Sequence, residues 1–144
     1  MAVLSVTAAN VLPSAAAIIN RNFTAGATIT AGQAVYLDTT TTPASPTWKL
    51  IDDNAASTGN ELATTKGIAC NGAASGQPLD VCIRDSDFTP GATLTNGLTV
   101  FTSATPGGIS QADIPTTGEY PTILGIAKST TKMNLNPTSS GAVI

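Results

Sequence analysis

Hydrophobic residues in this chain occur in short runs that are rich in β-branched and aromatic side chains and end at Gly, Pro, Asn or Asp. Runs of this kind predict β-strands. The run at residues 79–84 alternates strictly, so Leu79, Val81 and Ile83 are expected on one face of the strand. The predicted strands are residues 34–38, 48–51, 66–70, 79–84, 93–95, 98–101, 122–127 and 132–135.

Short polar turns predict which of these strands are neighbours. Asn96-Gly97 predicts a type I′ hairpin turn after the strand at 93–95, because both central residues of that turn need positive φ. Residues 129–131 predict a hairpin between the last two strands. Residues 72–76 predict another hairpin, which would pair the third predicted strand with the fourth.

The regular spacing of strands and turns predicts an all-β fold, either a small β-sandwich or a β-barrel. The length of 144 residues fits one domain. We expect an N-terminal arm at residues 1–23, a β-rich body at residues 24–135 and an extended C-terminal tail at residues 136–144. At most one short helix is expected, at residues 14–20, with Ser14 as its N-cap.

Charge is scarce along the whole sequence. Only 10% of the residues are Asp, Glu, Lys or Arg, there is no histidine, and the net charge is −3, whereas an ordinary soluble domain is roughly 25% charged. The chain is therefore suited to being covered by neighbours or to presenting a neutral polar surface. The scattered cations and the acidic balance argue against nucleic acid as a partner. The sequence has neither a polybasic run, which would indicate an anionic membrane surface, nor an apolar run of about 20 residues, which would indicate a transmembrane helix.

The inventory of reactive side chains is poor. Without histidine, His-dependent triads and His metal sites are excluded, and we expect no enzymatic activity, no cofactor and no metal. The pairs Asp52-Asp53 and Asp85-x-Asp87 can in principle hold calcium, but they lack the rest of an EF-hand loop. We interpret both pairs as solvated turns or turn caps.

The N-terminus lacks the positive region of a secretory signal, so we expect synthesis in a cytosol. Cys70 and Cys82 are then expected as reduced thiols. They could face each other across a hairpin, and we interpret them as small apolar residues. Two further segments stay open: the threonine tract at 39–42 is either a solvated loop or an interface, and the polar loop at 52–65 is long enough to be functional.

Two stretches carry a family resemblance. The first is a strand with the pattern Gly-x-x-Val-Tyr at residues 32–36, and the second runs from Gly-Ile-Ala at residues 67–69 through Ala-Ala-Ser-Gly at residues 73–76 to the alternating strand. Together with the Gly-rich turns at 107–108 and the Gly-Ile-Ala at 125–127, this pattern resembles the small head decoration (capsid cement) proteins of tailed bacteriophages.

The resemblance implies a non-enzymatic structural protein on the outer surface of the capsid of a virion. Its partners would be the major capsid protein and further copies of itself, as a homotrimer that staples neighbouring capsid subunits. The alternative is a receptor- or glycan-binding module of a viral fibre or adhesin. We expect three aromatic residues to be core or trimer-interface anchors: Tyr36, Trp48 and Phe101. We expect five residues of the arm to contact the capsid or a neighbouring subunit: Val3, Leu4, Val6, Val11 and Leu12.

Overall fold

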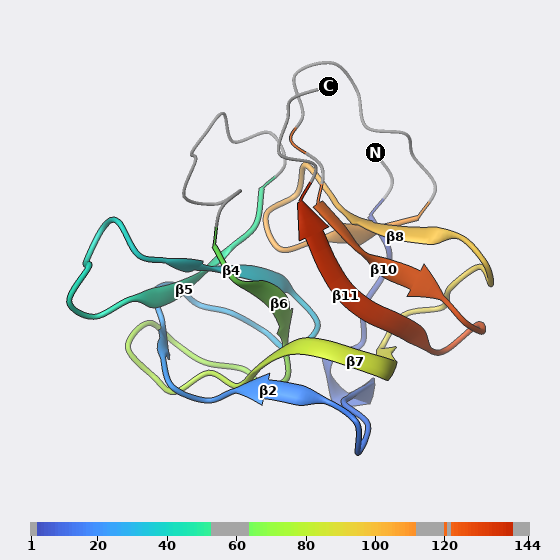
Figure 1. The fold of residues 1–144 in the computed structure, drawn as a ribbon, viewed down its shortest axis with the longest axis horizontal. Coiled ribbons are helices and arrows are strands. Elements are labelled where there is room, and N and C mark those ends of the chain that lie inside the picture. Colours follow the sequence, from blue (N-terminus) through green and yellow to red (C-terminus); the bar gives the residue numbers. More distant parts are fainter. Residues whose placement is uncertain (1–2, 53–63, 112–119, 121, 140–144) are drawn as a thin grey trace.

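The computed structural model describes residues 3–52, 64–111, 120 and 122–139, and these residues form an all-β fold with a single 3₁₀ turn, η1 (Ala8–Asn10) (Figure 1). The all-β prediction is confirmed. The strands are β1 (Val11–Leu12), β2 (Ile18–Asn20), β3 (Thr24–Ala25), β4 (Ala34–Asp38), β5 (Thr47–Leu50), β6 (Lys66–Ala69), β7 (Val81–Pro90), β8 (Thr99–Thr102), β9 (Ile109–Ser110), β10 (Thr122–Ala127) and β11 (Met133–Ser139).

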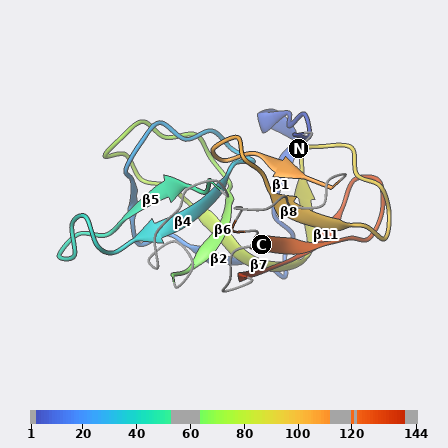
Figure 2. The same ribbon diagram turned by 90° about the horizontal axis from the view of Figure 1, so that it is seen from above.

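Strand β7 joins the two halves of the sheet. The strands follow the order β3-β5-β4-β6-β7-β11-β10-β8-β9, and β1 and β2 also pair with β7. Cys82 of β7 pairs with Ile68 of β6 on one side and with Ile19 of β2 on the other, so β2 covers the edge of β7 opposite β6. The β4–β5 hairpin lies at one end of the molecule and β8, β10 and β11 lie at the other, with β7 between them (Figures 1 and 2).

The strands β4, β6 and the start of β7 separate two apolar clusters. Alternate residues of a strand point to opposite faces, and accordingly Ile68 belongs to the larger cluster and Ala69 to the smaller one. The larger cluster holds most of the buried side chains of the C-terminal strands, and the smaller one surrounds the fully buried Trp48. Leu79 and Val81 lie in the smaller cluster and Ile83 packs against it, as their alternation predicts.

Several predicted elements are confirmed. β4 has the predicted bounds, and β6 pairs antiparallel with β7 through the expected hairpin. β10 and β11 pair antiparallel around residues 129–131. β11 continues to Ser139, so the first residues of the predicted tail belong to the sheet, while residues 140–144 lie outside the described residues.

The predicted helix at residues 14–20 is wrong. Ser14 does cap a turn, since its hydroxyl accepts the N–H of Ala16 at 3.1 Å, but the chain then enters strand β2. Two β-branched residues, Ile18 and Ile19, favour a strand at this position. Pairing with β7 gives the backbone groups of this segment hydrogen-bond partners. A helix this short would be only marginally stable on its own.

The hairpin predicted around Asn96-Gly97 is wrong, both in its turn type and in its first strand. Of the two central residues of this turn, Gly97 has positive φ, at 83°, and Asn96 does not, since the described part of the chain has no non-glycine residue with positive φ. The N–H of Leu98 donates to the carbonyl of Thr95 at 3.3 Å, which closes the turn. Residues 93–95 form no strand, because the N–H of Leu94 donates to the carbonyl of Thr130 in the β10–β11 turn instead.

The N-terminal residues pack against the body and do not extend away from it. The N–H of Leu4 donates to the carbonyl of Ile109, and that of Thr7 donates to the carbonyl of Gly91, both at 2.8 Å. Leu4 and Val6 pack against the larger apolar cluster. The expected arm is therefore, over its described residues, an integral part of the fold.

Candidate interaction surfaces

Residues 3–20, which we call the N-terminal strip, form an uncharged border along β7. The first ionisable side chain of the chain is Arg21. The strip reaches β7 through its strands β1 and β2. Its most exposed large side chains are Leu12, at 64%, and Ile18, at 50%. Apolar side chains that stand in solvent on an uncharged strip can be covered by a partner without desolvating a charge.

The strip is held in place by a buried carboxylate. Asp85 of β7 is fully buried. It accepts the N–H of Ser14 at 2.7 Å, the hydroxyl of Ser14, and the N–H of Asp87 at 3.0 Å. Of the two interpretations, the solvated turn is wrong for Asp85, and the turn cap agrees with its bond to the backbone N–H of Asp87. A carboxylate with three such donors can be buried without being left unpaired.

Two of the five predicted arm contacts are exposed. Leu12 and Val3, the latter at 42%, stand in solvent. Leu4, Val6 and Val11 are half-buried and pack against the larger apolar cluster of their own chain. Ile18 was missed, because assigning residues 14–20 to a helix hid the strand that turns this side chain outward.

A second exposed apolar surface lies on the C-terminal strands. Ile123 is 41% exposed and Ile126 is 53% exposed, and both belong to β10. Phe101 of β8 pairs with Ile123 and is half-buried. On the other side, Thr138 and Asn134 of β11 pair with Ile123 and Ile126. We call these five residues the β10 outer face.

The three predicted anchors have different positions. Trp48 is a core residue, fully buried, with its ring edge-on to Phe23 at 6.4 Å between centroids. Tyr36 is half-buried and packs against the larger cluster. Phe101 is on the β10 outer face, so its prediction as an interface anchor stays open.

The threonine tract at 39–42 wraps around a buried carboxylate. Asp38 is 3% exposed and lies 2.8 Å from the Nζ of Lys49. Its carboxylate also accepts the hydroxyl of Thr41 at 2.6 Å and the N–H of Thr40 at 2.9 Å. Lys49 first, and the Thr41 hydroxyl next, lower the pKa of Asp38 below its ordinary value of 3.8. The side chains of residues 40–45 remain exposed.

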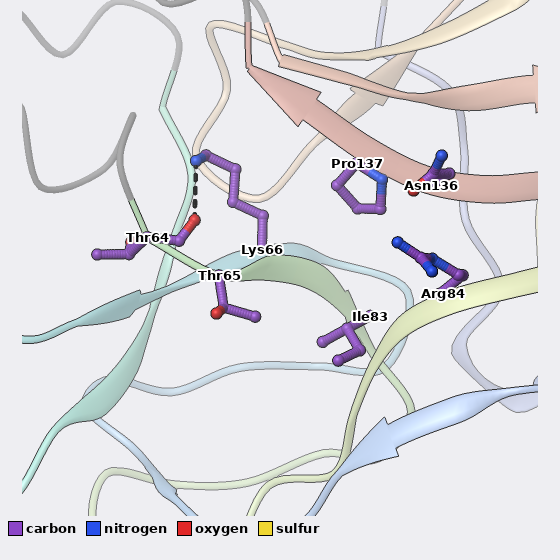
Figure 3. A pocket seen from close by; sticks show the side chains of 7 residues that line it. All are labelled: Thr64, Thr65, Lys66, Ile83, Arg84, Asn136 and Pro137. Carbon is purple, nitrogen blue, oxygen red and sulfur yellow. Dashed lines mark hydrogen bonds between the residues drawn. The ribbon is translucent and has the colours of Figure 1, made fainter.

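A pocket of about 290 Å³ opens between β6, β7 and β11 (Figure 3). Two cations line it: Lys66, whose Nζ donates to the carbonyl of Thr64 at 3.1 Å, and the exposed Arg84. Thr65, Ile83, Asn136 and Pro137 complete the described lining. The pocket can attract an anionic group, but its described residues offer no carboxylate or thiol for acid–base or nucleophilic chemistry.

Cys70 directly follows β6 and Cys82 belongs to β7, and both thiols are free. The Cys82 thiol donates to the carbonyl of Arg84 at 3.6 Å and the Cys70 thiol to that of Ile68 at 3.8 Å. The neighbouring Cys82 side chain lowers the pKa of Cys70. The same contact, together with burial, raises the pKa of Cys82. Cys82 packs in the larger cluster and Cys70 against it, which agrees with their interpretation as small apolar residues.

Within the described ranges, no three His, Cys, Asp or Glu side chains gather into a group that could hold a metal ion. Asp52 is half-buried, and Asp53 and most of the predicted loop at 52–65 lie outside those ranges. No helix among the described residues is long and apolar enough to span a membrane. No protein-family model, curated protein or solved structure matches this chain. The resemblance to head decoration proteins therefore stays a prediction from the sequence.

Proposed function

We propose that this protein is a non-enzymatic head decoration protein of a tailed bacteriophage, which binds the outer surface of the capsid and stabilises the lattice of the major capsid protein. It would be made in the host cytoplasm and act in the virion. The sequence resemblance suggests the class of protein, and the exposed apolar surfaces of the fold suggest how it binds.

The N-terminal strip carries the proposal. It presents Leu12 and Ile18 to solvent over a segment of the chain that has no ionisable side chain before Arg21. An isolated soluble domain normally surrounds exposed apolar residues with mixed charges. A strip that lacks these charges is suited to a surface that a neighbour covers.

Many repeated binding sites would allow such weak contacts to hold the protein on the capsid. Each copy buries only a narrow strip, but a capsid lattice offers the same site many times, and copies that also contact one another bind with the advantage of multivalency. Because only the folded chain binds the lattice, attachment stabilises the fold of the decoration protein by mass action. The same attachment stabilises the lattice.

The test is reconstitution onto heads that lack the protein. Leu12→Lys places a charge on the N-terminal strip, and Leu98→Lys places the same charge on another exposed leucine, 45% exposed, outside the strip. We expect Leu12→Lys to weaken attachment by about tenfold or more and Leu98→Lys to bind like the wild type. Unchanged attachment of Leu12→Lys would contradict the proposal.

The alternative, a receptor- or glycan-binding module, requires a pocket with aromatic or carboxylate side chains for the ligand. The pocket of Figure 3 has neither among its described lining residues. No specific observation favours this alternative over the decoration protein.

A further inference from the structure

A β-bulge in β10 turns two isoleucines toward the same side of the sheet. The pairing of β10 shifts register between Ile123 and Gly125, both against β11 and against β8. Leu124 and Gly125 are consecutive and both buried, whereas Ile123 and Ile126 are both exposed. In a regular strand, residues three positions apart point to opposite faces. The bulge is therefore what places Ile126 beside Ile123 on the β10 outer face.

The bulge requires a glycine at position 125. A Cβ atom on Gly125 would lie 1.9 Å from the carbonyl oxygen of Asn134, a distance that no side chain can tolerate. Only glycine allows β10 and β11 to approach so closely at this point. Without the bulge, the alternation would turn Ile126 inward and Ala127 outward, which is the arrangement expected of a monomer that protects its core.

We propose that the β10 outer face is the surface through which this chain contacts a second copy of itself. The biological meaning of this contact rests on the function proposed above, where neighbouring copies would meet on the capsid. Its physical basis is independent of the capsid and can be measured on the isolated chain.

The charge distribution favours a second copy over a partner of a different kind. β8, β10 and β11 contain no ionisable residue, although the whole chain has a net charge of −3. A charged partner would find no counter-charge on these strands. A second copy would bring no like charges together at the contact, so the repulsion expected between two acidic chains is absent where they meet.

The polar members of the face are also compatible with a copy of themselves. Asn134 is exposed and carries an amide that both donates and accepts hydrogen bonds, and Thr138 has a hydroxyl with the same property. Self-contact between identical surfaces requires groups of this kind, since each group can meet its own counterpart.

Among the described residues, a group of charges lies at the border of this surface. In the turn after β10 and at the start of β11, Lys128 and Lys132 both bind the carboxylate of Asp87, at 3.3 Å and 2.9 Å. A centre of isoleucine and phenylalanine side chains with charged groups at its margin has the composition of an interface with an apolar core and a polar rim.

The experiment is sedimentation equilibrium of the purified full-length chain from about 1 µM to about 500 µM, which spans the affinity of weak and moderate self-association. We expect the wild type to self-associate and Ile126→Lys to raise the dissociation constant by about tenfold or more. Leu12→Lys is the matched control: it adds the same charge at a similarly exposed position on β1, and its self-association should equal that of the wild type. Ile126→Thr is the second variant, for use if the lysine variant does not fold. It keeps a β-branched residue in the strand and should weaken self-association in the same direction but by less.

A wild type that remains monomeric over the whole range, or a folded Ile126 variant that associates like the wild type, would overturn the proposal. Loss of association in Leu12→Lys but not in the Ile126 variants would do so as well. Because no capsid is present, these outcomes are separate from attachment to heads: a chain that self-associates through β10 yet does not bind heads would contradict the proposed function alone.

Discussion

Ser14 and Asp85 lie 71 residues apart in the sequence and are joined by two hydrogen bonds, from the amide N–H and from the hydroxyl of Ser14 to the two carboxylate oxygens of Asp85. The pair fastens the turn between β1 and β2 to the middle of β7. It thereby fixes the position of the N-terminal strip, whose exposed Leu12 and Ile18 flank this turn.

The first prediction concerns this pair. Ser14→Ala removes one donor to the carboxylate and should lower the free energy of unfolding by about 1.5 kcal/mol, the lower end for a hydrogen bond to a charged group. Asp85→Ala leaves the donors of Ser14 and Asp87 without their acceptor and should cost about 3 kcal/mol. Urea unfolding at constant m-value measures both. If the alanine at position 85 were no more harmful than the one at position 14, the carboxylate would not be the anchor of the strip.

The second prediction concerns acid stability. Lys49 and the Thr41 hydroxyl hold the folded-state pKa of Asp38 below 3.8, so the carboxylate stabilises the fold at pH values above 3.8. This contribution is lost as the pH falls from about 4 toward the lower folded-state pKa, because the unfolded chain then binds the proton first. Asp38→Asn should therefore be less stable than the wild type at pH 7 and should show a smaller loss below pH 4. Parallel pH profiles of the two proteins would contradict this assignment.

The third prediction concerns the bulge in β10. Gly125→Ala places a methyl group against the carbonyl oxygen of Asn134 and should destabilise the protein by about 2 kcal/mol or more. Gly72→Ala is the control, because the nearest atom to its new Cβ is the carbonyl oxygen of Ile29 at an ordinary 3.8 Å. This control should change the stability by less than about 0.5 kcal/mol. Equal midpoints for the two variants in thermal unfolding would show that the close approach of β10 and β11 is not required.

The fourth prediction concerns the thiols. Cys70 is partly exposed and the neighbouring Cys82 side chain lowers its pKa, whereas Cys82 is buried and has a raised pKa. In the folded protein, an aromatic disulfide reagent should react with Cys70 and leave Cys82 unmodified until denaturant is added. Mass spectrometry of the modified peptides identifies the site. Modification of Cys82 at the same rate as Cys70 under native conditions would contradict the burial of its thiol.

The sequence predicted strands well where their pattern was local. The bounds of β4, the alternation of Leu79, Val81 and Ile83, and the final hairpin follow from side-chain period and turn residues alone. It failed at residues 14–20, where a serine before a run of alanines fits a helix start, but the preference of Ile18 and Ile19 for the edge of β7 decided the structure. That edge is formed by residues more than 60 positions away, so no local pattern reports it.

The interaction surfaces were predictable only in part. The apolar side chains of the arm were visible in the sequence, but which of them face solvent depends on packing, and Leu4, Val6 and Val11 face their own core. We therefore expect that deleting residues 2–20 would destabilise the body by removing β1, β2 and the Ser14 contacts, contrary to the view of the arm as a separable segment. Ile126 was hidden because a bulge, which the sequence pattern does not reveal, sets its direction.

The proposed function requires this chain to be spread over the capsid lattice. The most direct measurement is its copy number relative to the major capsid protein in purified particles, by quantitative mass spectrometry. We expect about one copy per major capsid subunit, as a lattice-wide arrangement of symmetric clusters requires. A few dozen copies per particle or fewer would place the chain on a fibre, vertex or neck, and its absence from particles would contradict a role in the virion.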